Sequence, residues 1–154
     1  MKKYLSGILG LFLAVMLLAA LFPSQSDAAV SITIRNNRSH DMNFAFRWSG
    51  FDSPQDRRAG WYVVRAGQSR TLTFNSAVYA LTSTDFGYYA TGGGSTWRGN
   101  AENGLPVTIH PRNAFNGHPN GRIEGGQRVF FRRINLTAVD DRREDGRATL
   151  TFNP

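Results

Sequence analysis

The chain has 154 residues, no cysteine and a formal net charge of +7 at pH 7. This length is enough for one domain with a modest hydrophobic core, and the lack of cysteine excludes disulfides, thiolate metal sites and cysteine nucleophiles. The positive charge favours anionic partners such as phosphates, acidic glycans or envelope polymers, through a long-range attraction that salt screens.

The first 28 residues have the three-part layout of a secretory signal peptide. Two lysines form the basic start, an apolar stretch follows over residues 8–21, and Pro23 breaks it. We expect cleavage after Ala28, or one residue later, and an exported domain over residues 29–154. A retained membrane anchor is the alternative, but a spanning helix needs about 20 apolar residues and this stretch is shorter.

The exported part carries its positive charge entirely on arginine. Both lysines and Asp27 belong to the leader, which leaves 16 arginines against 10 acidic residues, a net charge of +6. Arginine forms planar, bidentate pairs with carboxylate and phosphate, so a dedicated anion site is one interpretation. Cross-strand ion pairs or genome composition would produce the same bias, and composition does not decide between them.

Apolar and polar residues alternate through the first half of the exported part, which is the pattern of half-buried strands. Asparagine and aspartate between the first two strands suit a hairpin turn, so these two strands are expected to pair. The expected elements are strands over 30–34 and 42–48 joined by a turn over 36–41, a strand over 61–65, a turn over 66–68 and a strand over 71–75.

The second half continues the β pattern, and no amphipathic helix follows the leader. The expected elements are strands over 77–82 and 86–91, a flexible glycine loop before Trp97, a short strand over 107–110, a loop over 112–126, and a C-terminal hairpin that pairs 128–139 with 148–152. About eight short strands with turn signals between them predict a single all-β domain, either an antiparallel β-sandwich or a flattened barrel.

Several short motifs resemble a known family. They are Asn36-Asn37, Gly60-Trp61-Tyr62-Val63-Val64, Ala66-Gly67-Gln68 and Gly87-Tyr88-Tyr89-Ala90. They resemble the small exported bacterial domains catalogued as a domain of unknown function (DUF1036-like), over about half of the exported part. The family carries two cysteines, where this chain has Ser69 at one position and Arg35 near the other. The resemblance implies export and a β domain, and it implies no activity.

Two clusters suggest metal ions, each with an ordinary alternative. His110 and His118 lie on one loop and could hold zinc or copper, but their spacing matches no compact motif and the proline after each histidine suits a turn. Four carboxylates fall within residues 140–145, but two arginines lie among them and the ligand order of a helical calcium loop is absent. We therefore assign no metal and no cofactor.

Nothing in the sequence selects a catalytic residue. The motif Gly-x-Ser-x-Gly is absent, and no helix follows Gly93-Gly94-Ser95 as a phosphate-binding loop requires. Paired carboxylates for glycoside cleavage remain an open alternative, although no pair stands out. The acids that could supply such a pair are Asp52, Asp56, Asp85 and Glu102.

The aromatic residues and their arginine neighbours form the leading candidate site. In consecutive pairs of strand residues one side chain faces the core and the other faces out, so some rings should be exposed and able to stack on sugars or peptides. Core packing of the same rings is the alternative. The candidate ligand-binding residues are Trp61, Tyr62, Tyr88, Tyr89, Trp97 and Arg98.

We therefore expect an exported, non-enzymatic binding module in the periplasm or outside the cell. Its ligand is a glycan, an anionic envelope component or another protein, held by an aromatic and arginine face. A hydrolase of envelope polymers and a structural envelope protein are the alternatives. Nucleic acid is not an expected partner because of export, and no membrane-spanning segment is expected in the mature chain.

Overall fold

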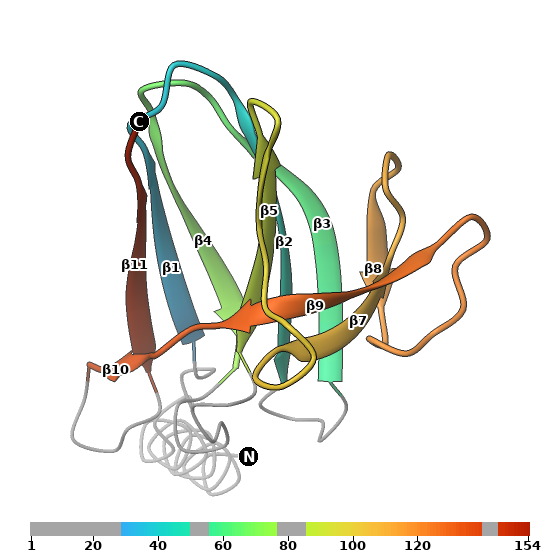
Figure 1. Cartoon of the computed structure of the whole chain (residues 1–154). Helices are drawn as coiled ribbons and strands as arrows, with labels where there is room; N and C mark the ends of the chain where they lie inside the picture. Colours follow the sequence, from blue (N-terminus) through green and yellow to red (C-terminus); the bar gives the residue numbers. More distant parts are fainter. Residues whose placement is uncertain (1–28, 50–55, 77–85, 140–144) are drawn as a thin grey trace, which may run out of the picture.

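The computed structural model describes residues 29–49, 56–76, 86–139 and 145–154. These residues form eleven strands and no helix (Figure 1). The strands are β1 (Ala29–Asn36), β2 (Met42–Ser49), β3 (Asp56–Val64), β4 (Ser69–Asn75), β5 (Gly87–Gly92), β6 (Ser95–Trp97), β7 (Leu105–Ile109), β8 (Phe115–Gly117), β9 (Gln127–Arg133), β10 (Thr137–Ala138) and β11 (Gly146–Phe152). The expected leader and the expected strand over 77–82 lie outside the described residues, as does most of the acidic turn.

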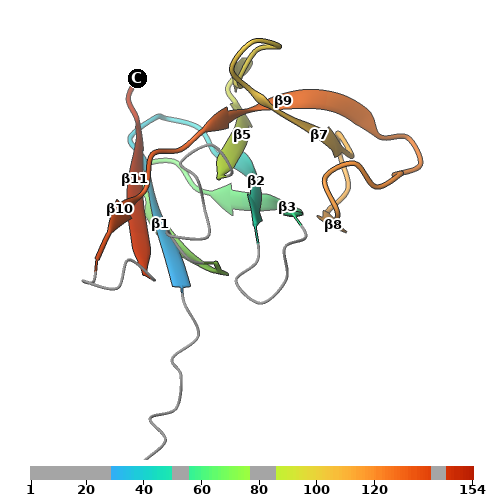
Figure 2. The same cartoon turned by 90° about the horizontal axis from the view of Figure 1, so that it is seen from below.

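Two sheets pack against each other. The smaller sheet has the order β10-β11-β1-β4, and the larger one has the order β7-β9-β5-β2-β3-β8, with β6 also paired to β5. Figure 2 shows the larger sheet curving round from β2 through β5 and β9 to β7, so that it forms half of a barrel. The predicted all-β class and sandwich-like architecture are confirmed. No helix in the described part of the chain has the length and apolar character of a membrane span.

The larger sheet has a hydrophobic cluster on each face. The inter-sheet core joins both sheets and includes Ile32, Phe44, Phe46 and Phe74, together with other buried residues of β1, β2, β4 and β5. The half-barrel core fills the concave face and consists of Ala45, Tyr89, Leu105, Val107, Ile109, Val129 and Phe131, with Trp61 and Phe115 packed against them. The larger sheet is therefore covered on both sides near its centre.

The strand pairings differ from the expected hairpins. β1 and β2 do not pair, because β1 lies between β4 and β11, and its pairing with β11 is parallel. The turn between them carries the chain from the smaller sheet to the larger one. The C-terminal hairpin is reduced to two residue pairs of β10 and β11, while β9 leaves to pair with β5 and β7.

Two further segments also depart from the expectation. β3 begins at Asp56, five residues before the strand predicted over 61–65, because β2 and β8 flank it on both edges. The segment 112–126 contains the short strand β8, which pairs with residues 58–60 of β3.

The side chain of Asn36 connects the end of β1 by hydrogen bonds to the turn after β1 and to the turn after β3. Its side chain is fully buried. The amide Nδ2 donates hydrogen bonds to the carbonyl oxygens of His40, Val64 and Arg65 at 2.9, 3.0 and 3.1 Å. Its Oδ1 accepts the N–H of Arg38 at 3.1 Å. One side chain therefore satisfies backbone groups of the crossing turn, of the end of β3 and of the turn that follows β3.

Replacing Asn36 by alanine should strongly destabilise the protein. The substitution removes the amide donor from three carbonyls, of which that of Arg65 keeps the N–H of Gln68. We expect the free energy of unfolding to fall by about 2–4 kcal/mol. Chemical denaturation followed by tryptophan fluorescence measures this loss. Asn37→Ala is the matched control, because Asn37 is exposed and, among the described residues, its side chain bonds only the side chain of Asn153. Equal stability losses in the two variants would contradict the role of the Asn36 hydrogen bonds in stabilising the fold.

Candidate functional site: a groove at the open edge of the sandwich

Tyr88 and Tyr89 point to opposite faces of β5, yet both are buried. Tyr88 is 5% exposed and belongs to the inter-sheet core, and Tyr89 is 7% exposed and belongs to the half-barrel core. The expectation that one ring of this pair faces solvent is wrong. The reason is that the larger sheet curls, so that residues on both of its faces are buried. The alternation rule assumes that one face packs on the core and the other is exposed to solvent.

Trp61 and Tyr62 divide in the same way. Trp61 packs against Phe115 and Tyr89 in the half-barrel, with ring centroids 5.6 and 5.9 Å apart, and its Nε1 donates to the carbonyl oxygen of His110 at 3.0 Å. Tyr62 joins the inter-sheet core. The four rings of these two pairs therefore do not form a common binding face.

Trp97 lies at a different place, the open edge between the two sheets. Gly93 and Gly94 have φ angles of 57° and 77°, so they form a tight two-residue turn rather than the flexible loop that was expected. This turn folds β6 back on β5 and pairs Trp97 with Ala90. The indole ring meets Phe152 edge to face at 5.3 Å, and the guanidinium of Arg38 lies 5.0 Å from its centroid.

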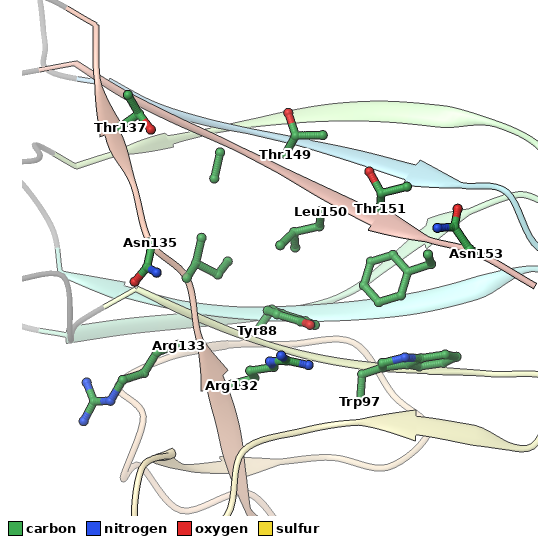
Figure 3. A pocket seen from close by; sticks show the side chains of 13 residues that line it. Tyr88, Trp97, Arg132, Arg133, Asn135, Thr137, Thr149, Leu150, Thr151 and Asn153 are labelled. Carbon is green, nitrogen blue, oxygen red and sulfur yellow. The ribbon is translucent and has the colours of Figure 1, made fainter.

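A groove of about 530 Å³ opens beside Trp97 (Figure 3). One wall is β11 of the smaller sheet, and the other wall comes from β5, β6 and the chain that leaves β9. We call this cavity the edge groove. The described residues that line it are Tyr88, Trp97, Arg132, Arg133, Ile134, Asn135, Thr137, Ala148, Thr149, Leu150, Thr151, Phe152 and Asn153.

A second hollow of about 620 Å³ continues the edge groove past the end of β9. The two share Arg132, Arg133 and Asn135, and we call the second one the arginine trough. Its described lining consists of Arg98, Gly99, Asn100, Asn103, Arg132, Arg133 and Asn135. No aspartate or glutamate occurs among the described residues that line either hollow, so the lining is positively charged.

The three arginines of the two hollows differ in their contacts. Arg132 is exposed and lies beside Tyr88 in the edge groove. Burial raises the pKa of Tyr88, and the charge and hydrogen bond of Arg132 oppose this rise. Arg133 donates from Nε to the carbonyl oxygen of Asn103 at 2.9 Å. Arg98 is exposed and makes no hydrogen bond or ion pair with any other described residue.

Three of the six expected site residues thus line the two joined hollows, Tyr88 and Trp97 in the edge groove and Arg98 in the arginine trough. Sequence reasoning missed the remaining walls, which come from β9 and β11. The adjacent pair Arg132-Arg133 at the end of a strand was the available signal, but nothing in the sequence placed β9 beside β5 or β11 beside the glycine turn.

His110 and His118 serve as turn caps. Nδ1 of His110 accepts the N–H groups of Arg112 and Asn113 at 3.1 and 2.8 Å, and Nδ1 of His118 accepts the N–H of Asn120 at 3.2 Å. Within the described ranges, no three His, Asp or Glu side chains gather as metal ligands would. The geometry thus gives both His-Pro sequences a role in turns.

Another cavity, of about 520 Å³, lies beside Arg58, a buried arginine of β3. The Arg58 guanidinium donates to the carbonyl oxygens of Thr108, Pro119 and Gly121, the last two at 2.8 and 2.9 Å. Burial lowers the pKa of the Arg58 guanidinium. The side chain connects β3 to β7 and to the loop after β8, so Arg58 closes the half-barrel.

Arg58→Met should destabilise the half-barrel. The substitution keeps the length of the side chain but removes the guanidinium donor from three carbonyls, of which that of Pro119 keeps the N–H of Thr108. We expect a loss of about 2 kcal/mol in the free energy of unfolding. Thermal or chemical denaturation measures this loss. Arg57→Met is the matched control because Arg57 is the exposed neighbour on the same strand. If Arg58→Met proved as stable as this control, the closing role would be refuted.

The fold and the edge groove define a single all-β domain with a basic surface hollow. No protein-family model, curated protein or solved structure matches the chain at a significant level. The resemblance to the exported domain family therefore stays a prediction, as do the leader and the location outside the cytoplasm.

Proposed function

We propose that the protein is an exported, non-enzymatic binding module that holds an anionic macromolecule in the edge groove and the arginine trough. The observation that carries this proposal is the gathering of arginines over the two joined hollows without a carboxylate among their described lining residues. Arginine donors in such a setting pair with carboxylates or phosphates of a ligand. Asparagine amides at both ends supply further donors and acceptors.

The aromatic rings of the groove support a role in positioning a ligand rather than in stacking on a sugar ring. Tyr88 is almost fully buried, and Trp97 is half-buried between Phe152 and the guanidinium of Arg38. A sugar ring stacks on an exposed aromatic face, and neither ring offers a fully open one. Charge and hydrogen bonding therefore carry the binding, with the rings forming a rigid wall.

Removing two positive charges from the trough should weaken binding of acidic polymers. We expect the double variant Arg98→Gln/Arg132→Gln to lower the affinity for poly-glutamate or for an acidic polysaccharide about tenfold at low salt, because each lost pair is worth up to about 1 kcal/mol. Fluorescence anisotropy with labelled polymers measures the change. Added salt should weaken the wild-type binding as well.

The matched control is Arg65→Gln/Arg128→Gln, which removes the same charge from exposed positions outside both hollows. This control should bind nearly as tightly as the wild type. If both double variants lost the same affinity for every polymer, the attraction would be a property of the whole basic surface and the proposed site would be wrong.

A further inference from the structure

The β11 strand has an open edge inside the edge groove. On one side β11 pairs with β1 along its whole length, from Gly146 to Phe152. On its other side it pairs with β10 only at Gly146 and Arg147. Among the described residues, no strand pairs with this side of β11 beyond Arg147, because the chain that leads from β9 to β10 forms the other wall of the groove (Figure 3).

The strand register shows which backbone groups point to this open side. The backbone carbonyl of Asp145 accepts a hydrogen bond from the N–H of Val139, on the β10 side. The backbone carbonyl of Phe152 accepts one from the N–H of Asn37, on the β1 side. Backbone groups of alternate residues point to opposite edges of a strand. The N–H and C=O groups of Thr149 and Thr151 therefore point into the edge groove, away from β1.

An unpaired strand edge of this kind is a template for another extended chain. The exposed lining of the groove beside it is mostly polar, and Ile134 and Leu150 add apolar surface that a side chain of an added strand can contact. An added strand antiparallel to β11 would continue the line of β10 and would leave the groove near Asn135. The arginine trough begins at that residue.

We propose that the edge groove binds an extended peptide by strand addition to β11, with acidic residues at the carboxyl end of the peptide lying in the arginine trough. This inference rests on the proposed function and names its partner class, a protein segment rather than a glycan. Main-chain hydrogen bonds to Thr149 and Thr151 supply register, and the positive trough selects acidic residues over basic ones.

The test uses a synthetic peptide of alternating threonine and valine followed by a run of aspartate and glutamate. Two N-methylated versions carry methyl groups on alternate residues, one set on the even and the other on the odd positions of the strand. A methyl group on nitrogen removes the donor without changing charge. Only one set of N–H groups faces β11, so one version should lose affinity by about tenfold or more and the other should bind nearly as well as the parent.

Hydrogen exchange of the protein amides is read in the same samples by NMR. Peptide binding should slow exchange at Thr149 and Thr151, and Arg98→Gln/Arg132→Gln should weaken this binding, with Arg65→Gln/Arg128→Gln as the control. Alternating sensitivity to N-methylation together with this protection supports strand addition.

The contrary outcomes separate the two proposals. Equal affinity of both N-methylated peptides, or tighter binding of an acidic oligosaccharide that depends on Arg98 and Arg132, would overturn strand addition and leave the anionic groove standing. Protection of Thr149 and Thr151 that rises with protein concentration alone would identify a second copy as the occupant and overturn the peptide proposal. Binding of peptide and oligosaccharide that ignores the arginine substitutions would overturn both proposals.

Discussion

The parallel pairing of β1 with β11 is the constraint on which the rest of the molecule depends. It brings the first and last described strands together at the centre of the smaller sheet, in register from Val30 with Gly146 to Asn36 with Phe152. Because β4 occupies the other edge of β1, the chain after Asn36 must cross to the opposite sheet. The buried amide of Asn36 stabilises this crossing, because it donates hydrogen bonds to backbone carbonyls on both sides of it.

The same pairing creates the candidate site. Among the described residues, β11 has β1 on one side and only the two-residue β10 on the other, which leaves its outer edge open where the two sheets separate. The glycine turn after β5 places Trp97 across from this edge, and the end of β9 adds Arg132 and Arg133. Long open edges favour aggregation, and here the edge is short, lies in a groove and has arginines nearby, which limits that hazard.

The sequence was informative about strands and poor about their partners. Alternating residues such as Val30, Ile32 and Ile34 identify a strand and its buried face, but period two carries no information about which strand lies beside it. The predicted hairpin of β1 and β2 failed for this reason. The burial of both Tyr88 and Tyr89 was missed because a curled sheet covers both faces, and single-sequence alternation assumes that one stays wet. Trp97 and Arg98 were found from chemistry alone, whereas Thr149 and Thr151 were ordinary strand residues until the topology left their edge open.

Hydrogen exchange of individual amides in the free, full-length protein tests the central claim most directly. If the edge of β11 is open, the amides of Thr149 and Thr151 exchange rapidly, while those of Ala148 and Leu150, which point towards β1, are strongly protected. Equal and strong protection of all four amides in dilute protein would mean that a strand already covers this edge, and the account of the groove as a binding site would be wrong.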